Sequence, residues 1–311
     1  MSEKLFLLGV GCQKGGTTWL HQYLDSHPQC NLGFQKEYHV FDAKYLEACR
    51  GIYRNRQASL ESLMQARQQD AGKANSKLDE KILRKSQLVS FYEEPASYAD
   101  YFARLYDEDS NTKLVGDITP AYSALAAEHY SGIRALLEAH GFTVKVVFLM
   151  RDPIERIYSA IYMEIARKKR RRKSIDKGPE KLFLSKYDDA KTEMKTRYEN
   201  TIINLDKSFE TENTYLGFYE TLFNDEGVRG VTDFLEIDFV KPDTGKKVHA
   251  ASQKKPLSGA SIKRVREYYD HTYRFCYDRF GQEFISTIWK NAELRADDDG
   301  FLGKIRRLTG I

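Results

Sequence analysis

The chain has 311 residues, of which 41% are hydrophobic and 30% charged, and this balance is typical of a soluble globular protein with a core of its own. The net charge of +4 is too small to indicate a nucleic-acid partner, and no apolar run reaches the ~18–20 residues of a membrane-spanning helix. Four scattered cysteines have neither metal-site spacing nor the density of a disulfide framework, so we expect reduced thiols in a cytoplasmic protein.

The first predicted unit is a strand, a glycine-containing turn and a helix. KLFLLGV (4–10) is an apolar run of strand type, and TTWLHQYLDSHP (17–28) predicts a helix that ends before its proline. GCQKGG (11–16), between them, is typical of a phosphate-binding loop, because glycines let the backbone turn tightly at the positive end of a helix. The Walker A pattern G-x-x-x-x-G-K-[ST] is altered, however: Thr17 occupies the lysine position and the lysine is Lys14. A plain strand-to-helix connection is the alternative reading.

Strands and helices alternate through the middle of the chain. NLGFQKEYHVFD (31–42) is predicted to be extended, and residues 43–110 to be mostly helical. TKLVGDITPAYS (112–123) predicts a short strand that turns at its proline, followed by a helix to about residue 140. FTVKVVFLM (142–150) has the strongest buried-strand pattern in the chain.

The second half is predicted to be mainly helical. A helix begins at Pro153 and runs into the basic run RKKRRRK (167–173), since proline suits a first helical position. Further predicted elements are a loop over 174–184, helices over 185–210, a strand leading into a helix over 213–223, a helix over 227–237 and one long amphipathic helix over 261–281.

This alternation predicts an α/β fold with a central parallel sheet and helices on both faces, in a single domain over residues 1–311. Ligands of such folds bind at the carboxyl ends of the strands. The loop at Gly11, the segment at Glu37, the turn at Asp117 and the turn at Arg151 all follow or flank predicted strands. We therefore expect them to meet at one site.

Three stretches of the chain resemble the sulfotransferases that use 3′-phosphoadenosine 5′-phosphosulfate (PAPS). QKGGTTWL (13–20) is similar to the 5′-phosphosulfate loop P-K-[SA]-G-T-T-W-L, with Gln13 and Gly15 as mild departures. RDPIERIYSAIY (151–162) resembles the 3′-phosphate motif R-[DN]-P-x-x-R-x-x-S-x-[YF], and KEYHVFD (36–42) is similar to K-E-x-H-F-F-D of the Golgi glycosaminoglycan branch. The resemblance spans most of residues 5–165 and implies a P-loop-like nucleotide-binding architecture and transfer of a sulfonate to a hydroxyl.

The resemblance also implies a donor site. PAPS carries phosphate at both ends and therefore needs two cationic cradles, the loop for the 5′ end and Arg151 with Ser159 for the 3′-phosphate. Lys14 neutralises the bridging oxygen as the sulfonate leaves, and no metal is required. Arg156 is equally compatible with phosphate binding and with a surface or salt-bridging position. The expected residues for PAPS, or its product PAP, are Gln13, Lys14, Gly15, Gly16, Thr17, Thr18, Trp19, Arg151 and Ser159.

The catalytic residues that the resemblance implies are Glu37, Lys14 and His39. Glu37 is the expected general base, and the alternative is a solvated carboxylate paired with Lys36. In an extended segment, His39 shares a face with Glu37, so it orients the acceptor or acts as the base itself. Asp42 does the same or caps the next helix.

One departure leaves the acceptor open. DITPAY (117–122) stands where the glycosaminoglycan branch has E-K-[ST]-P-x-Y, so Ile118 replaces a lysine that would contact an anionic glycan. A carbohydrate or small metabolite, which could be anionic, is the favoured acceptor class.

Two other functions remain as alternatives. A P-loop kinase would use Asp117 or Asp152 for magnesium, but the displaced lysine argues against it. A nucleic-acid-binding protein would rest on residues 167–173 alone. We expect this run to recruit or gate an acidic acceptor, with a solubilising surface as the alternative.

Overall fold

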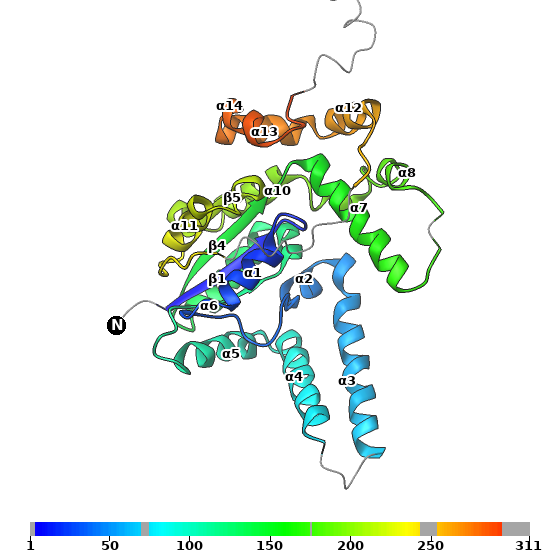
Figure 1. Cartoon of the computed structure of the whole chain (residues 1–311). Helices are drawn as coiled ribbons and strands as arrows, with labels where there is room; N and C mark the ends of the chain where they lie inside the picture. The colour runs from blue at the N-terminus through cyan, green and yellow to red at the C-terminus, as the bar shows by residue number, and fades with distance from the viewer. Residues whose placement is uncertain (1–3, 70–74, 175, 243–253, 294–311) are drawn as a thin grey trace, which may run out of the picture.

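The computed structural model describes residues 4–69, 75–174, 176–242 and 254–293 (Figure 1). Its centre is a five-stranded sheet with the order β2-β3-β1-β4-β5, in which every neighbouring pair is parallel. The four predicted strands are confirmed as β1 (Lys4–Gly11), β3 (Leu114–Ile118), β4 (Phe142–Met150) and β5 (Thr214–Phe218). The short strand β2 (Cys30–Asn31) was not predicted.

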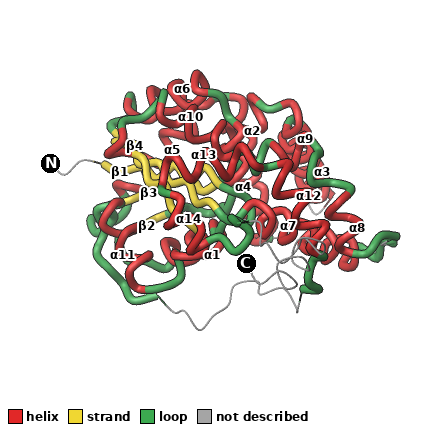
Figure 2. The backbone as a smooth tube through the Cα atoms, turned by 90° about the horizontal axis from the view of Figure 1, so that it is seen from above, coloured by secondary structure: helices red, strands yellow, loops and turns green. Residues whose placement is uncertain are grey.

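Both faces of the sheet are covered, because alternate side chains of β1 enter two separate hydrophobic clusters. Phe6 and Leu8 belong to the larger cluster, which residues of α5, α6, α7, α10 and α13 complete, whereas Leu5 and Leu7 belong to a smaller one with α1 and α11. Seen from above, helices lie on either side of the strands (Figure 2). The predicted α/β fold with helices on both faces is therefore confirmed.

The helices of the first half follow the predicted pattern. In Figure 1, α3 and α4 form a hairpin that projects from the body of the molecule. Their bounds, with those of the other helices up to β4, are α1 (Thr17–Asp25), α2 (Val40–Tyr45), α3 (Gly51–Gln69), α4 (Ser76–Glu93), α5 (Pro95–Asp107) and α6 (Ala127–Glu138).

The second half corrects several predicted boundaries. Its helices are α7 (Pro153–Arg170), α8 (Pro179–Leu184), α9 (Ala190–Glu193), α10 (Tyr198–Asp206), α11 (Asp225–Phe234), α12 (Gly259–Tyr268), α13 (Asp270–Phe280) and α14 (Gln282–Ile288). The predicted loop over 174–184 contains α8, because buried Phe183 packs its ring against Tyr158 of α7. The predicted helix over 261–281 breaks at Tyr269, whose buried hydroxyl donates to the carbonyl of Tyr187 at 2.6 Å.

The connections of the sheet reverse their direction between β1 and β4. From β1 the chain proceeds to β2 and β3 on one side, whereas from β4 it proceeds to β5 on the other. Ligands of open α/β sheets bind at such a reversal. Within the described ranges, no helix is both long and apolar enough to cross a membrane.

Candidate active site

The loop after β1 leaves a row of backbone N–H groups unused. The amide of Cys12 donates to Leu149 of β4 at 2.7 Å, and the amide of Gly15 donates back to Cys12 at 3.0 Å. These two bonds fold the loop over the end of β4, so that its next amides and the first turn of α1 point outward. Among the described residues, no hydrogen bond uses the N–H groups of Lys14, Gly16, Thr17 and Thr18.

Both glycines of the loop are required by close contacts. A Cβ on Gly15 would lie 2.5 Å from the carbonyl oxygen of Leu149. Gly16 has a φ of 98° and begins α1, and a Cβ there would lie 2.9 Å from a methyl group of Leu222. Beside them, Cys12 is buried, and burial raises the pKa of its thiol to about 11. A thiol with a raised pKa is a poor nucleophile, so these properties suit a small side chain that fills the loop.

Arg151, at the end of β4, lies against this loop. Its Nη1 donates to the carbonyl oxygen of Lys14 at 3.3 Å, and its guanidinium covers the ring of Tyr219 at 4.0 Å from the centroid. Its Nε is buried and has no hydrogen-bond partner among the described residues. Burial, then Arg151 and then Lys36 lower the pKa of Lys14. Lys14, Lys36 and Arg151 therefore gather beside the loop, where Glu155 lies 3.6 Å from Nη2 of Arg151, and this excess of cations favours an anionic ligand.

Asp152 and Ser159 belong to the motif that begins at Arg151, but their contacts differ. The Oδ1 of Asp152 caps α7 and also accepts from the hydroxyl of Tyr273 at 3.0 Å, while its Oδ2 accepts two bonds from Asn291. Ser159 lies farther along α7 and is half-buried, and no hydrogen bond joins it to Arg151 within the described residues. The structure thus brings Arg151 to the loop and uses Asp152 to hold α7.

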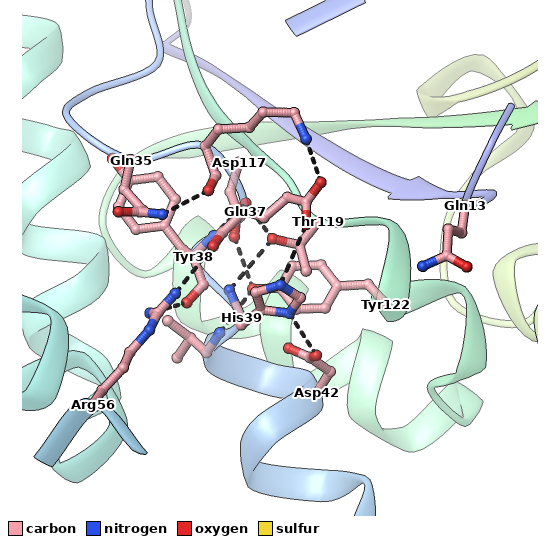
Figure 3. A network of polar contacts seen from close by, with 12 residues as sticks. Gln13, Gln35, Glu37, Tyr38, His39, Asp42, Arg56, Asp117, Thr119 and Tyr122 are labelled. Atoms are coloured by element: carbon pink, nitrogen blue, oxygen red, sulfur yellow. Dashed lines mark hydrogen bonds and ion pairs between the residues drawn. The ribbon is translucent and has the colours of Figure 1, made fainter. Parts of the chain in front are cut away.

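Beside the loop, a chain of charged side chains runs through Glu37 (Figure 3). Lys36 forms an ion pair with Oε1 of Glu37, whose Oε2 lies 3.4 Å from Nε2 of His39. The Nδ1 of His39 lies 2.8 Å from Oδ2 of Asp42, which is fully buried. Glu37 is thus paired with Lys36, as one reading held, and with His39 as well.

The charges of this chain distinguish the two candidates for the base. Burial opposes ionisation of Glu37, yet its hydrogen bonds with His39 and Lys36 lower its pKa to about 2. Burial also disfavours the imidazolium form of His39, yet its hydrogen bonds with Asp42 and Glu37 raise its pKa to about 9. Near neutral pH, Glu37 is a carboxylate with free lone pairs, while His39 carries a proton on each nitrogen. Only Glu37 is in a form that accepts a proton.

The segment over 31–42 was predicted to be extended, and this prediction is wrong. Glu37 and His39 have φ values of 61° and 56°, in the left-handed region, and Tyr38 between them is fully buried. Arg56 of α3 holds the turn, because its guanidinium donates to the carbonyl oxygens of Tyr38 at 2.6 Å and Glu37 at 3.2 Å. Tertiary contacts therefore bring the side chains of Glu37 and His39 together, where the prediction relied on strand alternation.

The DITPAY stretch is the support on which this turn rests. Oδ1 of Asp117 accepts from the hydroxyl of Thr119 at 2.7 Å and Oδ2 from that of Tyr122 at 2.7 Å. The amide of His39 donates to Thr119 and the amide of Val40 donates to the hydroxyl of Tyr122 at 3.1 Å. Burial raises the pKa of Asp117. Through Thr119 and Tyr122, the carboxyl group of Asp117 therefore holds the backbone of the Glu37 turn in place.

Packing explains the departure at Ile118, and the basic run lies apart from the sheet. Ile118 is buried in the smaller hydrophobic cluster, against Gly9, so this position belongs to the core. The basic run begins in the last turn of α7, which points away from the sheet (Figure 1). All side chains of the basic run are exposed except that of Lys168, which is half-buried and has its Nζ 3.2 Å from Oε1 of Glu164.

Residues outside the three motifs complete the site. Arg56 comes from α3, and Lys195, between α9 and α10, reaches Oε1 of Gln13 at 3.4 Å. Glu220 accepts from the amide of Asp152 at 3.1 Å, and burial raises its pKa to about 7. None of the three lies in a recognisable pattern, because the tertiary fold alone brings Arg56 to the Glu37 turn and Lys195 and Glu220 to the motifs at Gln13 and Asp152.

A family model and a solved structure agree with this architecture. A model of the sulfotransferase family matches residues 7–241. The sulfotransferase from Alicyclobacillus acidocaldarius is similar in fold, with 18% identity and a TM-score of 0.54 over 89% of this chain and 96% of that one. The sulfotransferase domain of the Synechococcus PCC 7002 olefin synthase gives 18% identity and a TM-score of 0.41 over 86% and 94%. A search of curated proteins finds no match. Because the family model covers most of the chain, we conclude that the chain belongs to the sulfotransferase family.

Proposed function

We propose that this sulfotransferase moves the sulfonate of PAPS to a hydroxyl group of an acceptor by in-line displacement. The observation that carries the proposal is the pairing of two features at one edge of the sheet. One is the row of unused amides with Lys14 and Arg151, and the other is the Glu37–His39–Asp42 chain. The first suits an anionic donor, and the second suits removal of a proton.

The loop and Arg151 are suited to the donor. The amides of residues 14 and 16–18 would receive the 5′-phosphosulfate, together with the hydroxyls of Thr17 and Thr18 and their neighbour Trp19. Arg151 has a buried Nε that no described residue contacts by a hydrogen bond, and it would form a forked contact with the 3′-phosphate, to which Ser159 adds its hydroxyl. Bound PAPS supplies the activated sulfonate, and Lys14 neutralises the charge that develops on the departing phosphate.

Glu37 acts as the base in this proposal. The acceptor oxygen forms a bond to sulfur as the bond from sulfur to the phosphate oxygen breaks, and the hydroxyl proton passes to Glu37. Lys36 lies close enough to Lys14 to lower its pKa, so the anionic donor attracts Lys36 away from Glu37. Loss of that ion pair raises the pKa of Glu37 and makes it a stronger base. His39, held by Asp42, keeps the carboxylate in position.

The acids that a P-loop kinase would need for magnesium are engaged elsewhere. Asp117 bonds to the hydroxyls and backbone around Glu37, and Asp152 caps α7 and binds Asn291. These bonds favour sulfonate transfer over phosphoryl transfer. The acceptor is proposed to be a carbohydrate or a small metabolite. The four cysteines are free, which suits a reducing compartment such as the cytoplasm.

Incubation with PAPS labelled in its sulfonate and a panel of hydroxylated acceptors tests the proposal. We expect the label to move to at least one acceptor in the wild-type protein and not in Glu37→Gln. A wild-type protein that binds neither PAPS nor PAP in calorimetry would overturn the proposal.

A further inference from the structure

The carbonyl oxygen of Tyr38 accepts two hydrogen bonds, one from each helix of the α3–α4 hairpin. Nη1 of Arg56 in α3 donates to it at 2.6 Å, and the hydroxyl of Tyr92 in α4 donates to it at 3.1 Å. Nη1 of Arg56 also donates to the hydroxyl of Tyr92 at 2.6 Å, and Nη2 donates to the carbonyl oxygen of Glu37 at 3.2 Å (Figure 3). The hairpin therefore binds both of the peptide groups that join Glu37 to His39.

The same two peptide groups are bonded at their N–H ends as well. The amide of Tyr38 donates to Oδ1 of Asp117 at 3.4 Å, and the amide of His39 donates to the hydroxyl of Thr119 at 3.4 Å. The bonds from the hairpin are the shorter ones. The left-handed φ values of Glu37 and His39 are disfavoured for residues with a side chain, and such a backbone persists only where its surroundings hold it. The hairpin thus supplies the firmer half of the support for this turn.

Arg56 acts on the turn through the backbone and not through an ion pair. Within the described ranges, no carboxylate lies at ion-pair distance from Arg56, and the contacts that lower the pKa of Glu37 come from His39 and Lys36. No side chain of α3 is fully buried, so this helix adds little to the hydrophobic core. Arg56 is instead the residue through which α3 reaches the turn by hydrogen bonds.

We propose that the α3–α4 hairpin sets the geometry of the catalytic base, with Arg56 and Tyr92 as its positioning residues. Neither side chain touches the reacting atoms. They fix the two peptide groups on either side of Tyr38, and this directs the carboxylate of Glu37 and the imidazole of His39 toward each other. The inference rests on the proposed function, in which Glu37 accepts the hydroxyl proton, and deepens it. A displacement of about 1 Å at such a group can cost on the order of 100-fold in rate.

The titration of His39 in the ligand-free protein, followed by NMR, is the first test. The carboxylates of Glu37, at 3.4 Å, and Asp42, at 2.8 Å, hold the pKa of His39 at about 9. In Arg56→Met the turn relaxes and Glu37 moves away, so the pKa of His39 falls toward 6.5. Loss of the arginine charge alone would raise that pKa, so the sign separates positioning from electrostatics. Arg54→Met is the matched control, because Arg54 is exposed on the same helix.

Kinetics with PAPS and the acceptor that takes the label provide the second test. We expect Arg56→Met to lower kcat by roughly 10- to 100-fold and to leave the KM for PAPS and the affinity for PAP unchanged. Arg56→Lys recovers part of the loss, because a lysine keeps one donor to the turn but not the fork. Tyr92→Phe, which removes a single oxygen, gives a smaller loss and keeps both tests possible if Arg56→Met does not fold.

Two results overturn the proposal. One is a His39 titration in Arg56→Met that coincides with that of Arg54→Met, and the other is a loss of PAP affinity as large as the loss of kcat, which would indicate general damage to the fold. The titration needs neither nucleotide nor acceptor. A protein in which it shifts as expected, but which transfers no sulfonate, keeps Arg56 as the residue that positions Glu37 and refutes the proposed function only.

Discussion

The Nε2 of His39 lies 3.4 Å from Oε2 of Glu37, although the backbone is left-handed at both residues. This contact raises the pKa of one group and lowers that of the other, so both are charged near neutral pH. On the other side of the imidazole, Oδ2 of Asp42 lies 2.8 Å from Nδ1 of His39. Lys36 forms an ion pair with Glu37. The proposed roles of Glu37 as base and His39 as orienting residue are based on this arrangement.

Arg151→Ala is expected to weaken PAP binding by about 2–3 kcal/mol, roughly 30- to 150-fold, because a charge-assisted pair is lost. Isothermal calorimetry with PAP and ATP measures this, and the wild-type protein should bind PAP much more tightly than ATP. Arg274→Ala is the control, since its side chain is 75% exposed. Equal affinity of the wild type for the two nucleotides would contradict the donor assignment.

Glu37→Gln is expected to lower kcat by about 100-fold or more while PAP affinity stays nearly unchanged, because the amide cannot accept the hydroxyl proton. Lys14→Ala should reduce both quantities, since Lys14 serves the donor and the leaving phosphate. Steady-state kinetics and calorimetry on the same preparations separate the two effects. Full turnover by Glu37→Gln would transfer the base role to His39.

Lys36→Met is expected to move the acidic limb of the kcat/KM profile to higher pH. The hydrogen bond and charge of Lys36 help to lower the pKa of Glu37, so its removal lets that pKa rise. Profiles of the wild type and the variant are recorded over the same pH range with the same acceptor. A shift to lower pH, or no shift, would show that Lys36 does not control the ionisation of Glu37.

His39 should make the stability of the protein depend on pH. Its pKa is raised from 6.5 to about 9, so its stabilising contribution is fully present below pH 6.5 and is lost as the pH rises through 9. Thermal unfolding at pH 6, 7.5 and 9.5 should therefore show a larger fall in Tm for the wild type than for His39→Gln. Parallel curves for the two proteins would mean that the imidazole is not held charged.

Replacement of Arg170, Arg171 and Arg172 by alanine tests the basic run. The helix reaches Arg170, and at ~1.5 Å per residue this places it ~16 Å along the axis from Ser159, too far for direct contact with the sulfonate. We expect a higher KM for an acidic acceptor, a weaker dependence of KM on salt, and unchanged PAP affinity. Acceptor kinetics that do not change at low or physiological salt would leave the run as a solubilising surface.

Local patterns were sufficient for much of this protein. The strand 142–150 and the glycine loop with its helix were predicted from the sequence, because a buried parallel strand is continuously apolar and a phosphate-type turn needs glycine where the chain packs most closely. The order of motifs along the chain also predicted the family, and the match over residues 7–241 confirms it. These features depend on neighbouring residues in the sequence, which is why the sequence reveals them.

The tertiary structure alone decided how the site is held together. Arg56, Lys195 and the left-handed turn at Glu37 carry no local pattern, because their positions depend on contacts between segments distant in the chain. The same is true of Arg156, whose sequence position is compatible with a surface site, a salt bridge or a phosphate contact. The packing of α7 buries it, and its Nε and Nη1 have no hydrogen-bond partner in the part of the chain that the structure describes. Burial changes the charge and the role of a side chain, and burial is a property of the fold.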